Sequence, residues 1–321
     1  MNSPSAFPSS GADSAPPLSH GPGVADAVER VARSVVGLGT RRHGAAAGVV
    51  WQPGVVLTAA SAVGHASRVH VLLPDGESVV GEVRGVDPGT DLAVVALPAT
   101  AHGLPVAERR PIDTPLRVGD FVFAVGRNGS GSVHASFGHV GAAGGAWRTW
   151  RGGAVDRLIR LDGGLYPGLV GAPVADAAGQ VVGVASPALS RHHGVVLPAE
   201  TVDRVSAALL AHGRVVRGHI GIAAQSVALS AAMQAAASTD SASGLLVAGI
   251  GDDSPAARAG LLVGDIIVGA GGQAVTGIEK LRDLLSAERI GQALPLQLLR
   301  GGQPVTVNIE VAEHRPAHHR C

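Results

Sequence analysis

The strongest constraint on this chain is a long series of short β-rich runs, each bounded by glycine or proline. The runs occupy residues 48–51, 54–58, 69–73, 78–83, 92–97, 121–125, 157–161, 180–185 and 193–197. Many short strands at close spacing are typical of antiparallel sandwiches and barrels, and not of a parallel α/β sheet. The predicted fold class is therefore mainly β.

Composition and charge exclude several other classes. The 321 residues are enough for two domains, and 46 glycines with 20 prolines argue against a helical bundle. Aromatic residues are only 2% of the chain, so the cores must be built from valine, leucine, isoleucine and alanine. The 25 basic residues balance 25 acidic ones without a basic run, which argues against nucleic acid as a partner. The single cysteine, Cys321, is the last residue, so no internal disulfide can form.

Two helical patterns mark the limits of a first domain. Residues 25–34 place valines at helical spacing, and residues 198–210 put Val202, Val205 and Leu209 on one face. His212 and Gly213 then supply the end of the second helix. We predict a disordered segment over 1–24, a first domain over 25–212, a second domain over 213–314 and a tail over 315–321.

The first 23 residues are rich in serine, proline, glycine and alanine, without the basic region and apolar run of a secretory signal. Such a composition predicts disorder. No uncharged apolar run approaches the roughly 18 residues of a membrane helix. From the sequence as written we expect a cytoplasmic protein without a membrane anchor.

Three segments carry a resemblance to one family. Residues 54–63, Gly-Val-Val-Leu-Thr-Ala-Ala-Ser-Ala-Val, resemble the HtrA strand that ends in Thr-Asn-Asn-His-Val-Val. Residues 87–94, Asp-Pro-Gly-Thr-Asp-Leu-Ala-Val, match that family's Asp-x-x-Thr-Asp-Leu-Ala-Val. Residues 161–174, Leu-Asp-Gly-Gly-Leu-Tyr-Pro-Gly-Leu-Val-Gly-Ala-Pro-Val, resemble Thr-Asp-Ala-Ala-Ile-Asn-Pro-Gly-Asn-Ser-Gly-Gly-Pro-Leu. The resemblance implies two six-stranded antiparallel β-barrels of the trypsin-like (chymotrypsin) fold.

The same resemblance implies a broken catalytic triad. The family's histidine falls on Ser61 and its nucleophilic serine on Val170, whereas the aspartate is retained as Asp91. Valine has no nucleophilic atom, and a serine hydroxyl cannot act as a base near neutral pH. In another serine protease, loss of the nucleophile or the base costs about 10⁶ in kcat. We therefore predict that this site is inactive.

Other residues near the triad positions allow two interpretations. His65 is a possible base, but Val170 provides no nucleophile for a base to deprotonate. We therefore expect His65 to be an exposed loop residue. The resemblance places Ser186 on a strand that lines the substrate and does not reach the scissile carbon. Asp91 is either a remnant of the triad, with the Ser61 hydroxyl as its expected partner, or an aspartate that caps backbone amides.

Gly168 and Gly171 bracket the turn whose amides form the oxyanion hole in the family. An ordinary Pro-Gly turn kept for folding explains the two glycines as well.

A second resemblance begins at residue 217. Residues 217–222, Arg-Gly-His-Ile-Gly-Ile, resemble the Arg-Gly-x-Leu-Gly-Val that opens HtrA PDZ domains, and residues 254–268 resemble the most recognisable PDZ stretch. The resemblance implies a β-sandwich with two helices. We expect a helix over 279–286, a closing hairpin over 294–311, and a helix with a flexible loop in the Ala/Ser-rich insertion 225–243.

In PDZ domains, backbone amides receive a peptide's C-terminal carboxylate, and an adjacent strand edge adds the peptide as an extra strand. The resemblance places the amides at Ile220, Gly221 and Ile222, with Leu281 and Leu285 on the helix side of the groove. These residues also fit plain core positions, and both roles can hold together.

These observations predict an HtrA-like pseudoprotease that binds peptide C-termini or unfolded segments, with a chaperone-like, adaptor or regulatory role. The expected partners are peptides or unfolded proteins with apolar C-termini, an active HtrA paralogue, and further copies of the chain in a homo-trimer. No cofactor or metal is expected. The alternatives are a working HtrA-type serine endopeptidase in protein quality control, and a structural subunit of mixed oligomers. The residues Ser61 and Val170 discriminate between the pseudoprotease and the working endopeptidase.

Overall fold

The computed structural model describes residues 22–40, 44–164, 168–190 and 193–313. Of the predicted disordered segment, only residues 22–24 lie inside these ranges. The whole predicted tail lies outside them. Helix α1 (Pro22–Ala32) begins earlier than predicted, because a proline fits the first turn of a helix, where its missing N–H has no partner to lose.

The chain forms two compact units. The first unit comprises Met1–Val83, Val95–Gly145 and Arg157–Val202. The second unit comprises Arg84–Val94, Ala146–Asp156 and Asp203–Cys321.

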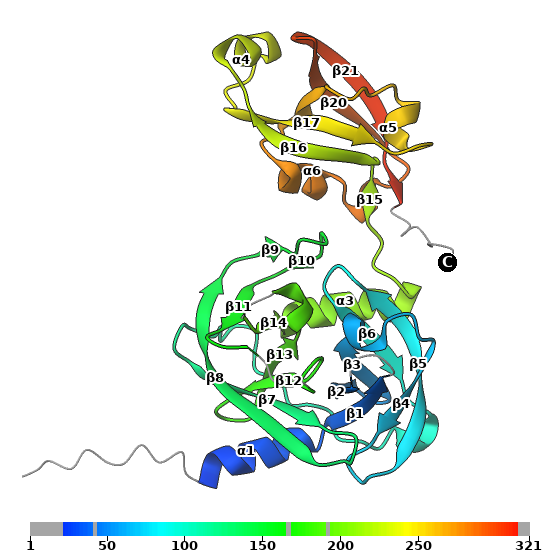
Figure 1. Ribbon diagram of the computed structural model, residues 1–321, viewed down its shortest axis with the longest axis vertical. Helices are drawn as coiled ribbons and strands as arrows, with labels where there is room; N and C mark the ends of the chain where they lie inside the picture. Colours follow the sequence, from blue (N-terminus) through cyan, green and yellow to red (C-terminus); the bar gives the residue numbers. More distant parts are fainter. Residues whose placement is uncertain (1–21, 41–43, 165–167, 191–192, 314–321) are drawn as a thin grey trace, which may run out of the picture. The chain divides into compact units, whose positions relative to one another are not determined.

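The first closed barrel has six strands in the order β1-β2-β3-β6-β5-β4 (Figure 1). They are β1 (Val35–Thr40), β2 (Gly44–Gln52), β3 (Val55–Ala59), β4 (Arg68–Leu72), β5 (Ser78–Asp87) and β6 (Leu92–Ala96). Val49 of β2 pairs with Leu57 of β3, and both are fully buried. The interior is aliphatic, as the composition predicts, with Trp51 as its one large aromatic side chain among the described residues.

The second closed barrel has the strand order β11-β14-β13-β12-β7-β8. Its strands are β7 (Phe121–Arg127), β8 (Val133–Gly144), β11 (Leu158–Leu161), β12 (Pro173–Asp176), β13 (Val181–Ala185) and β14 (Val195–Pro198). Strands β7 and β8 pair antiparallel along the whole length of β7. Two short strands, β9 (Trp147–Arg148) and β10 (Ala154–Val155), form a separate ribbon.

Short helices follow the barrel strands. They are α2 (Ala60–Val63), η1 (Ala99–Ala101), η2 (Pro187–Leu189) and α3 (Ala199–His212). The predicted apolar face of α3 is confirmed, because Val202, Val205 and Leu209 are all buried.

The C-terminal part of the second unit is a sheet in the order β16-β17-β18-β20-β21, with β19 paired to β18. Its strands are β16 (Ile222–Ala228), β17 (Ser243–Ile250), β18 (Ile266–Ala270), β19 (Gln273–Ala274), β20 (Ala293–Arg300) and β21 (Gln303–Glu310). Strands β15 (Gly218–His219) and β22 (Ala312–Glu313) pair separately. The helices are α4 (Ala231–Ala237), α5 (Pro255–Arg258), α6 (Ile278–Leu284) and η3 (Ala287–Arg289).

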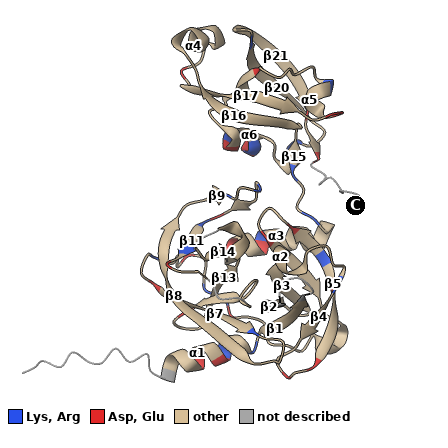
Figure 2. Cartoon of the chain, in the orientation of Figure 1, with Lys and Arg blue, Asp and Glu red and all other residues tan. Residues whose placement is uncertain are grey.

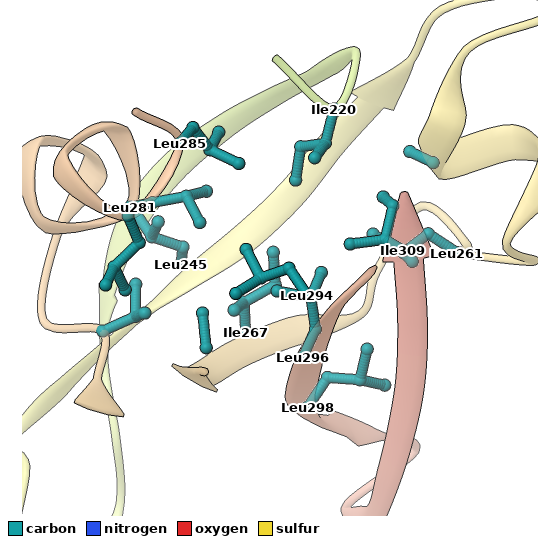
Figure 3. Packing of buried hydrophobic residues seen from close by; sticks show 14 of the residues in the cluster. Ile220, Leu245, Leu261, Ile267, Leu281, Leu285, Leu294, Leu296, Leu298 and Ile309 are labelled. Carbon is teal, nitrogen blue, oxygen red and sulfur yellow. The ribbon is translucent and has the colours of Figure 1, made fainter. Parts of the chain in front are cut away.

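Aliphatic side chains from the sheet and α6 make one core, in which Leu245, Ile267, Leu281 and Leu296 lie together (Figure 3). The predicted mainly β chain with two six-stranded barrels is confirmed, and the strands of the C-terminal region form one six-stranded sheet. One detail was wrong: residues 225–228 continue strand β16, and only residues 231–237 of the insertion are helical. Pairing of these residues with residues 243–246 of β17 overrides their weak strand propensity.

Candidate functional site

Ser61 lies in the short helix α2, directly after strand β3, and is partly buried. Two residues before α2, the hydroxyl of Thr58 donates a hydrogen bond of 2.7 Å to the carbonyl of Ala47 on β2. The end of β3 is therefore fixed to β2 just before Ser61. His65 is exposed in the turn after α2, as predicted.

Val170 lies in the turn before β12, between two glycines in the left-handed region. Gly168 has φ = 92° and Gly171 has φ = 76°. The amide of Ala47 donates to the carbonyl of Val170 at 2.9 Å, and the amide of Gly171 donates to the carbonyl of Ala185 at 3.0 Å. This turn and the end of β3 are therefore held by the same residue of β2, Ala47, so the structure brings the surroundings of Ser61 and Val170 together within the first unit.

A larger residue at Gly171 would force the turn away from strands β2 and β3. A Cβ atom there would lie 2.6 Å from the carbonyl oxygen of Ala47 and 2.6 Å from the amide nitrogen of Ala59. Both are backbone atoms, so neither can rotate away. The turn thus keeps a tight backbone geometry that needs glycine for space and for its positive φ.

Two side chains meet at Gly126 of β7, beside this turn. Leu169 is fully buried, and its Cδ2 would lie 2.9 Å from a Cβ built at Gly126 of β7. The ring of His134 on β8 lies over the same glycine, 2.7 Å from that position. An imidazole therefore lies near the turn, a feature that sequence reasoning missed because β8 was not predicted. Ser186 is fully buried, and its amide donates to the carbonyl of Val195.

Asp91 is fully buried in the turn before β6 and belongs to the segment 84–94 of the second unit. Its backbone has φ = 57°, a conformation that aspartate tolerates better than most residues. The expected hydrogen bond between Asp91 and the Ser61 hydroxyl stays a prediction.

Asp87, the first aspartate of the same motif, organises the turn. Its carboxylate accepts hydrogen bonds from the Gly89 amide at 3.1 Å and the Thr90 hydroxyl at 2.7 Å. Arg217, in the same unit, donates two further bonds, each of 2.8 Å. Burial acts to raise the pKa of Asp87, but the Arg217 guanidinium, the hydroxyl and the amide outweigh it and lower that pKa below its usual value. The pairing of Asp87 with Arg217 was not foreseen, because the two residues are 130 positions apart in the sequence.

The second candidate site is a groove of about 580 Å³ within the second unit. Its lining includes Ile220, Gly221 and Ile222 on one side and Leu281 and Leu285 on the other, so all five predicted peptide-site residues border it. Ile220, Leu281 and Leu285 are also buried members of the core, and their side chains point into it in Figure 3. They therefore occupy core positions and border the groove at once.

Backbone geometry orients the loop between β15 and β16. The carbonyl of Ile220 accepts a hydrogen bond from the Ala256 amide, and the carbonyl of Gly221 accepts one from the Gly251 amide, both at 2.9 Å. Gly221 has φ = 77°. Because the carbonyls of this loop bind neighbouring segments, its backbone amides are the groups that can bind an anion at the groove.

Charged residues border the groove, which the sequence did not indicate. Helix α6 contains acidic and basic residues, coloured red and blue in Figure 2. Arg282 binds Glu279 at 2.9 Å, and Arg148, from the segment 146–156 of the same unit, binds Asp283. Among the described residues, no group of three or more histidine, cysteine, aspartate or glutamate side chains is placed to hold a metal ion.

Two protein families match the chain. Residues 46–184 match the trypsin-like peptidase domain, and residues 218–311 match the PDZ domain. HhoA of Synechocystis sp., named as a serine protease, is 31% identical over 280 residues, which is 83% of this chain and 70% of HhoA. A DegP-like protein of Brucella suis biovar 1 is 32% identical over 270 residues, covering 82% of this chain and 51% of that protein. This chain thus spans about half of that relative's length.

Solved structures are similar over both units. The HtrA-type protease AlgW, solved with a tripeptide, has a TM-score of 0.72 and 29% identity, covering 92% of this chain and 99% of that one. A serine endoprotease from Yersinia pestis has a TM-score of 0.72 and 26% identity, covering 91% and 98%.

The names of the relatives correct the expected cytoplasmic location. The DegP-like proteins of Brucella suis and Chlamydia trachomatis are named periplasmic serine endoproteases, which contradicts that expectation. The expectation was wrong because it rested on the composition of the first residues, which carries no information about compartment. Within the described part of the chain, no helix is long and apolar enough to cross a membrane.

Proposed function

We propose that this chain, which belongs to the HtrA-type family of trypsin-like serine proteases with a PDZ domain, is a noncatalytic member that binds peptides. The observation that carries the proposal is the pair of residues at the triad positions, Ser61 and Val170. Serine proteases need a nucleophilic oxygen and a base that removes its proton. Val170 supplies no nucleophilic oxygen, and Ser61 supplies no base.

The surroundings of Val170 support the loss of chemistry. Val170 offers only methyl groups, and its neighbour Leu169 is fully buried. The imidazole of His134 could accept a proton, but a base without a nucleophile cannot cleave an amide. Ser186 follows the end of β13 and is fully buried, which argues against its use as a replacement nucleophile.

Peptide binding in the second unit needs none of the lost groups. A loop of backbone amides beside Gly221 and the edge of β16 are the features by which a PDZ domain holds a peptide C-terminus as an added strand. Strand β16 is an edge strand of its sheet. The groove beside it is bordered by Ile222 and Leu285, which favours an apolar C-terminal side chain. The relative AlgW was solved with a tripeptide, which supports this part of the proposal.

The proposed partners are unfolded proteins or peptides that end in valine, leucine, isoleucine or alanine. A chaperone-like holder and an adaptor of an active paralogue both fit this binding, and the names of the relatives support a periplasmic setting. Assembly into a homo-trimer is a separate proposal. Size-exclusion chromatography with light scattering tests it, and a monomer at micromolar concentration contradicts it.

The second candidate function is a working serine endopeptidase, because relatives at 31% identity are named as serine proteases. The experiment that separates the two is cleavage of unfolded casein at high protein concentration. We expect no turnover. Turnover that persists through purification and is abolished by a serine-directed phosphonate would establish the endopeptidase instead.

A further inference from the structure

We propose that Arg151 makes the groove prefer peptides with an acidic residue directly before the C-terminal one. The inference rests on the proposed peptide binding and names the class of peptide that is bound. Arg151 lies between β9 and β10, in the segment 146–156 that belongs to the second unit. Together with Gly152, it is one of the residues that line the groove.

A tight turn presents Arg151 at the end of the β9–β10 hairpin. The amide of Gly152 donates a hydrogen bond of 2.8 Å to the carbonyl of Thr149, so Trp150 and Arg151 are the two central residues of a β-turn. Thr149 is buried, and its hydroxyl donates to the carbonyl of Gly89 at 2.6 Å. The backbone of the turn is therefore fixed, while the side chains of Trp150 and Arg151 are exposed.

Arg151 differs from the other arginines of the groove because no carboxylate in the described part of the chain pairs with it. The other lining arginines each form an ion pair within the second unit: Arg148 with Asp283, Arg204 with Asp156, Arg217 with Asp87 and Arg282 with Glu279.

The guanidinium carbon of Arg151 instead lies 4.5 Å from the centroid of the Trp150 ring. The ring supplies no oxygen, so the N–H donors of Arg151 stay available to a carboxylate. Trp150 is itself 68% exposed. Tryptophan and arginine are enriched among the residues that contribute most to binding energy, which supports a contact with a ligand at this turn.

The fold fixes the direction of a bound peptide. Helix α6 ends beside the carboxylate loop, because the Leu285 carbonyl accepts a hydrogen bond of 3.2 Å from the Gly218 amide. The helix begins beside β16, where a Cβ atom at Gly277 would lie 3.8 Å from the hydroxyl oxygen of Ser226. A peptide whose carboxylate is bound beside Gly221 therefore has its preceding residues along β16 and toward the beginning of α6.

The turn of the hairpin meets α6 at Arg282, one helical turn before Leu285. A Cβ atom at Gly152 would lie 3.9 Å from the guanidinium carbon of Arg282. Three helical residues advance about 4.5 Å and one strand residue about 3.3 Å, so the turn lies about one to two residues before the peptide's C-terminal residue. Side chains of a strand alternate in direction. When the C-terminal side chain points into the apolar groove, the penultimate one points out, toward the rim on which Arg151 lies.

Two acidic residues also line the groove, and neither occupies this position. Asp283 accepts a hydrogen bond of 3.1 Å from Nε of Arg148, so its charge is paired. Glu288 lies in η3, after the end of α6, and so belongs to the carboxylate end of the groove. The unpaired charge beside the penultimate residue is therefore the positive charge of Arg151.

The expected preference has the size of an ion pair at an exposed site. A penultimate glutamate pairs with Arg151, whereas a glutamine of nearly the same shape carries no charge. The glutamate peptide should bind about threefold more tightly. The preference should shrink in about 0.5 M salt, because salt screens exposed charges.

The test uses the full chain and acetylated fluorescent peptides that differ only in the residue before a C-terminal valine, which is glutamate, glutamine or lysine. Fluorescence polarisation gives the affinity of each peptide. The wild-type chain should bind the glutamate peptide most tightly and the lysine peptide most weakly. Arg151→Gln should bind the glutamate and glutamine peptides equally, and Arg151→Glu should reverse the order. Arg68→Gln, at an exposed arginine of β4 in the first unit, is the matched control and should keep the wild-type order.

The affinity of the glutamine peptide reports whether each variant still folds and binds. Equal binding of the glutamate and glutamine peptides by the wild-type chain overturns the inference while leaving peptide binding intact. A glutamate preference that persists in Arg151→Gln also overturns it, because another cation then reads the peptide. If none of the three peptides binds below about millimolar concentration, or if amidated peptides bind equally well, the proposed carboxylate recognition itself is refuted. The two failures can thus be told apart.

Discussion

The turn around Val170 and the groove beside Gly221 are both built on a glycine with positive φ and a close backbone contact. Around Val170 the backbone geometry is intact, yet the reaction once implied by that geometry needs two side chains that are absent. In the proposed peptide groove the binding groups would be backbone amides and a strand edge, which any sequence that keeps the fold retains. Under the proposed function, activity that depends on side chains is lost with two substitutions, whereas binding that depends on the backbone persists with the fold.

The largest expected effect concerns the lost side chains. Val170→Ser alone should recover no measurable casein cleavage, because the missing base by itself leaves a deficit of about 10⁶ in kcat. Only Ser61→His combined with Val170→Ser can rebuild both groups, and its activity should stay far below that of an active relative because Leu169 and Ala172 also differ from the family around the nucleophile. Val170→Ala is the matched control. Activity in Val170→Ser alone would show that another base, such as His134, already serves this site.

The second prediction tests whether the turn is kept for its backbone. Gly171→Ala should destabilise the first unit by more than about 4 kcal/mol, since strain at positive φ is added to contacts with two backbone atoms. Gly76→Ala is the control, because Gly76 has φ = 89° but nothing within 4 Å of its added Cβ. It should cost only about 1 to 3 kcal/mol. Urea unfolding measures both, and equal losses would show that the contact with Ala47 and Ala59 carries no weight.

The third prediction concerns the groove. Ile222→Lys should weaken binding of a peptide ending in valine at least about tenfold, because it places a solvated charge against the apolar part of the groove. Amidating the peptide should weaken binding by a similar factor, since it removes the charge that the amides receive. Gln225→Lys, exposed on the same strand, is the matched control. Fluorescence polarisation is the measurement, and unchanged affinity in Ile222→Lys would place the peptide elsewhere.

The smallest effect is the acid sensitivity of the second unit. Asp265 is buried and accepts two hydrogen bonds from Arg300, at 2.9 and 2.8 Å, and these lower its pKa. A lowered pKa adds stability that is present above the pKa of the unfolded chain, near 4, and is lost as the pH falls through the folded value. The free energy of unfolding should therefore fall as the pH drops below about 4. Asp265→Asn should remove that part of the slope, and the exposed Asp240→Asn is its control; an unchanged slope in Asp265→Asn contradicts the assignment.

Much of the fold followed from the sequence because apolar β-branched runs predict buried strands. The runs that became β3, β4, β6, β7 and β13 were placed within a few residues of their observed bounds. Strand β8 was missed, because its outward positions are exposed and its glycine, alanine and histidine residues have weak strand propensity. It forms because β7 pairs with it from Phe121↔His139 to Arg127↔Val133, and such a partner cannot be read from a local pattern.

The candidate sites were predictable only where a motif fixed them. The five groove residues fell on one groove because residues 217–222 mark it. The contacts that hold these regions were not predictable, since they join residues far apart in sequence. Ala47 binds both Thr58 and Val170, and Asp87 binds Arg217. Segments 84–94 and 146–156, which lie in the first domain as predicted from sequence, group with the C-terminal residues in the second compact unit.

The central claim is that this chain binds peptides and does not cut them. The direct measurement follows one fluorescent peptide, ending in valine, incubated with an excess of the full chain. Polarisation should saturate with a Kd on the order of micromolar. Mass spectrometry after overnight incubation should recover the peptide intact. A saturating signal with a cleaved peptide, or an intact peptide that never binds below about millimolar concentration, would contradict the account.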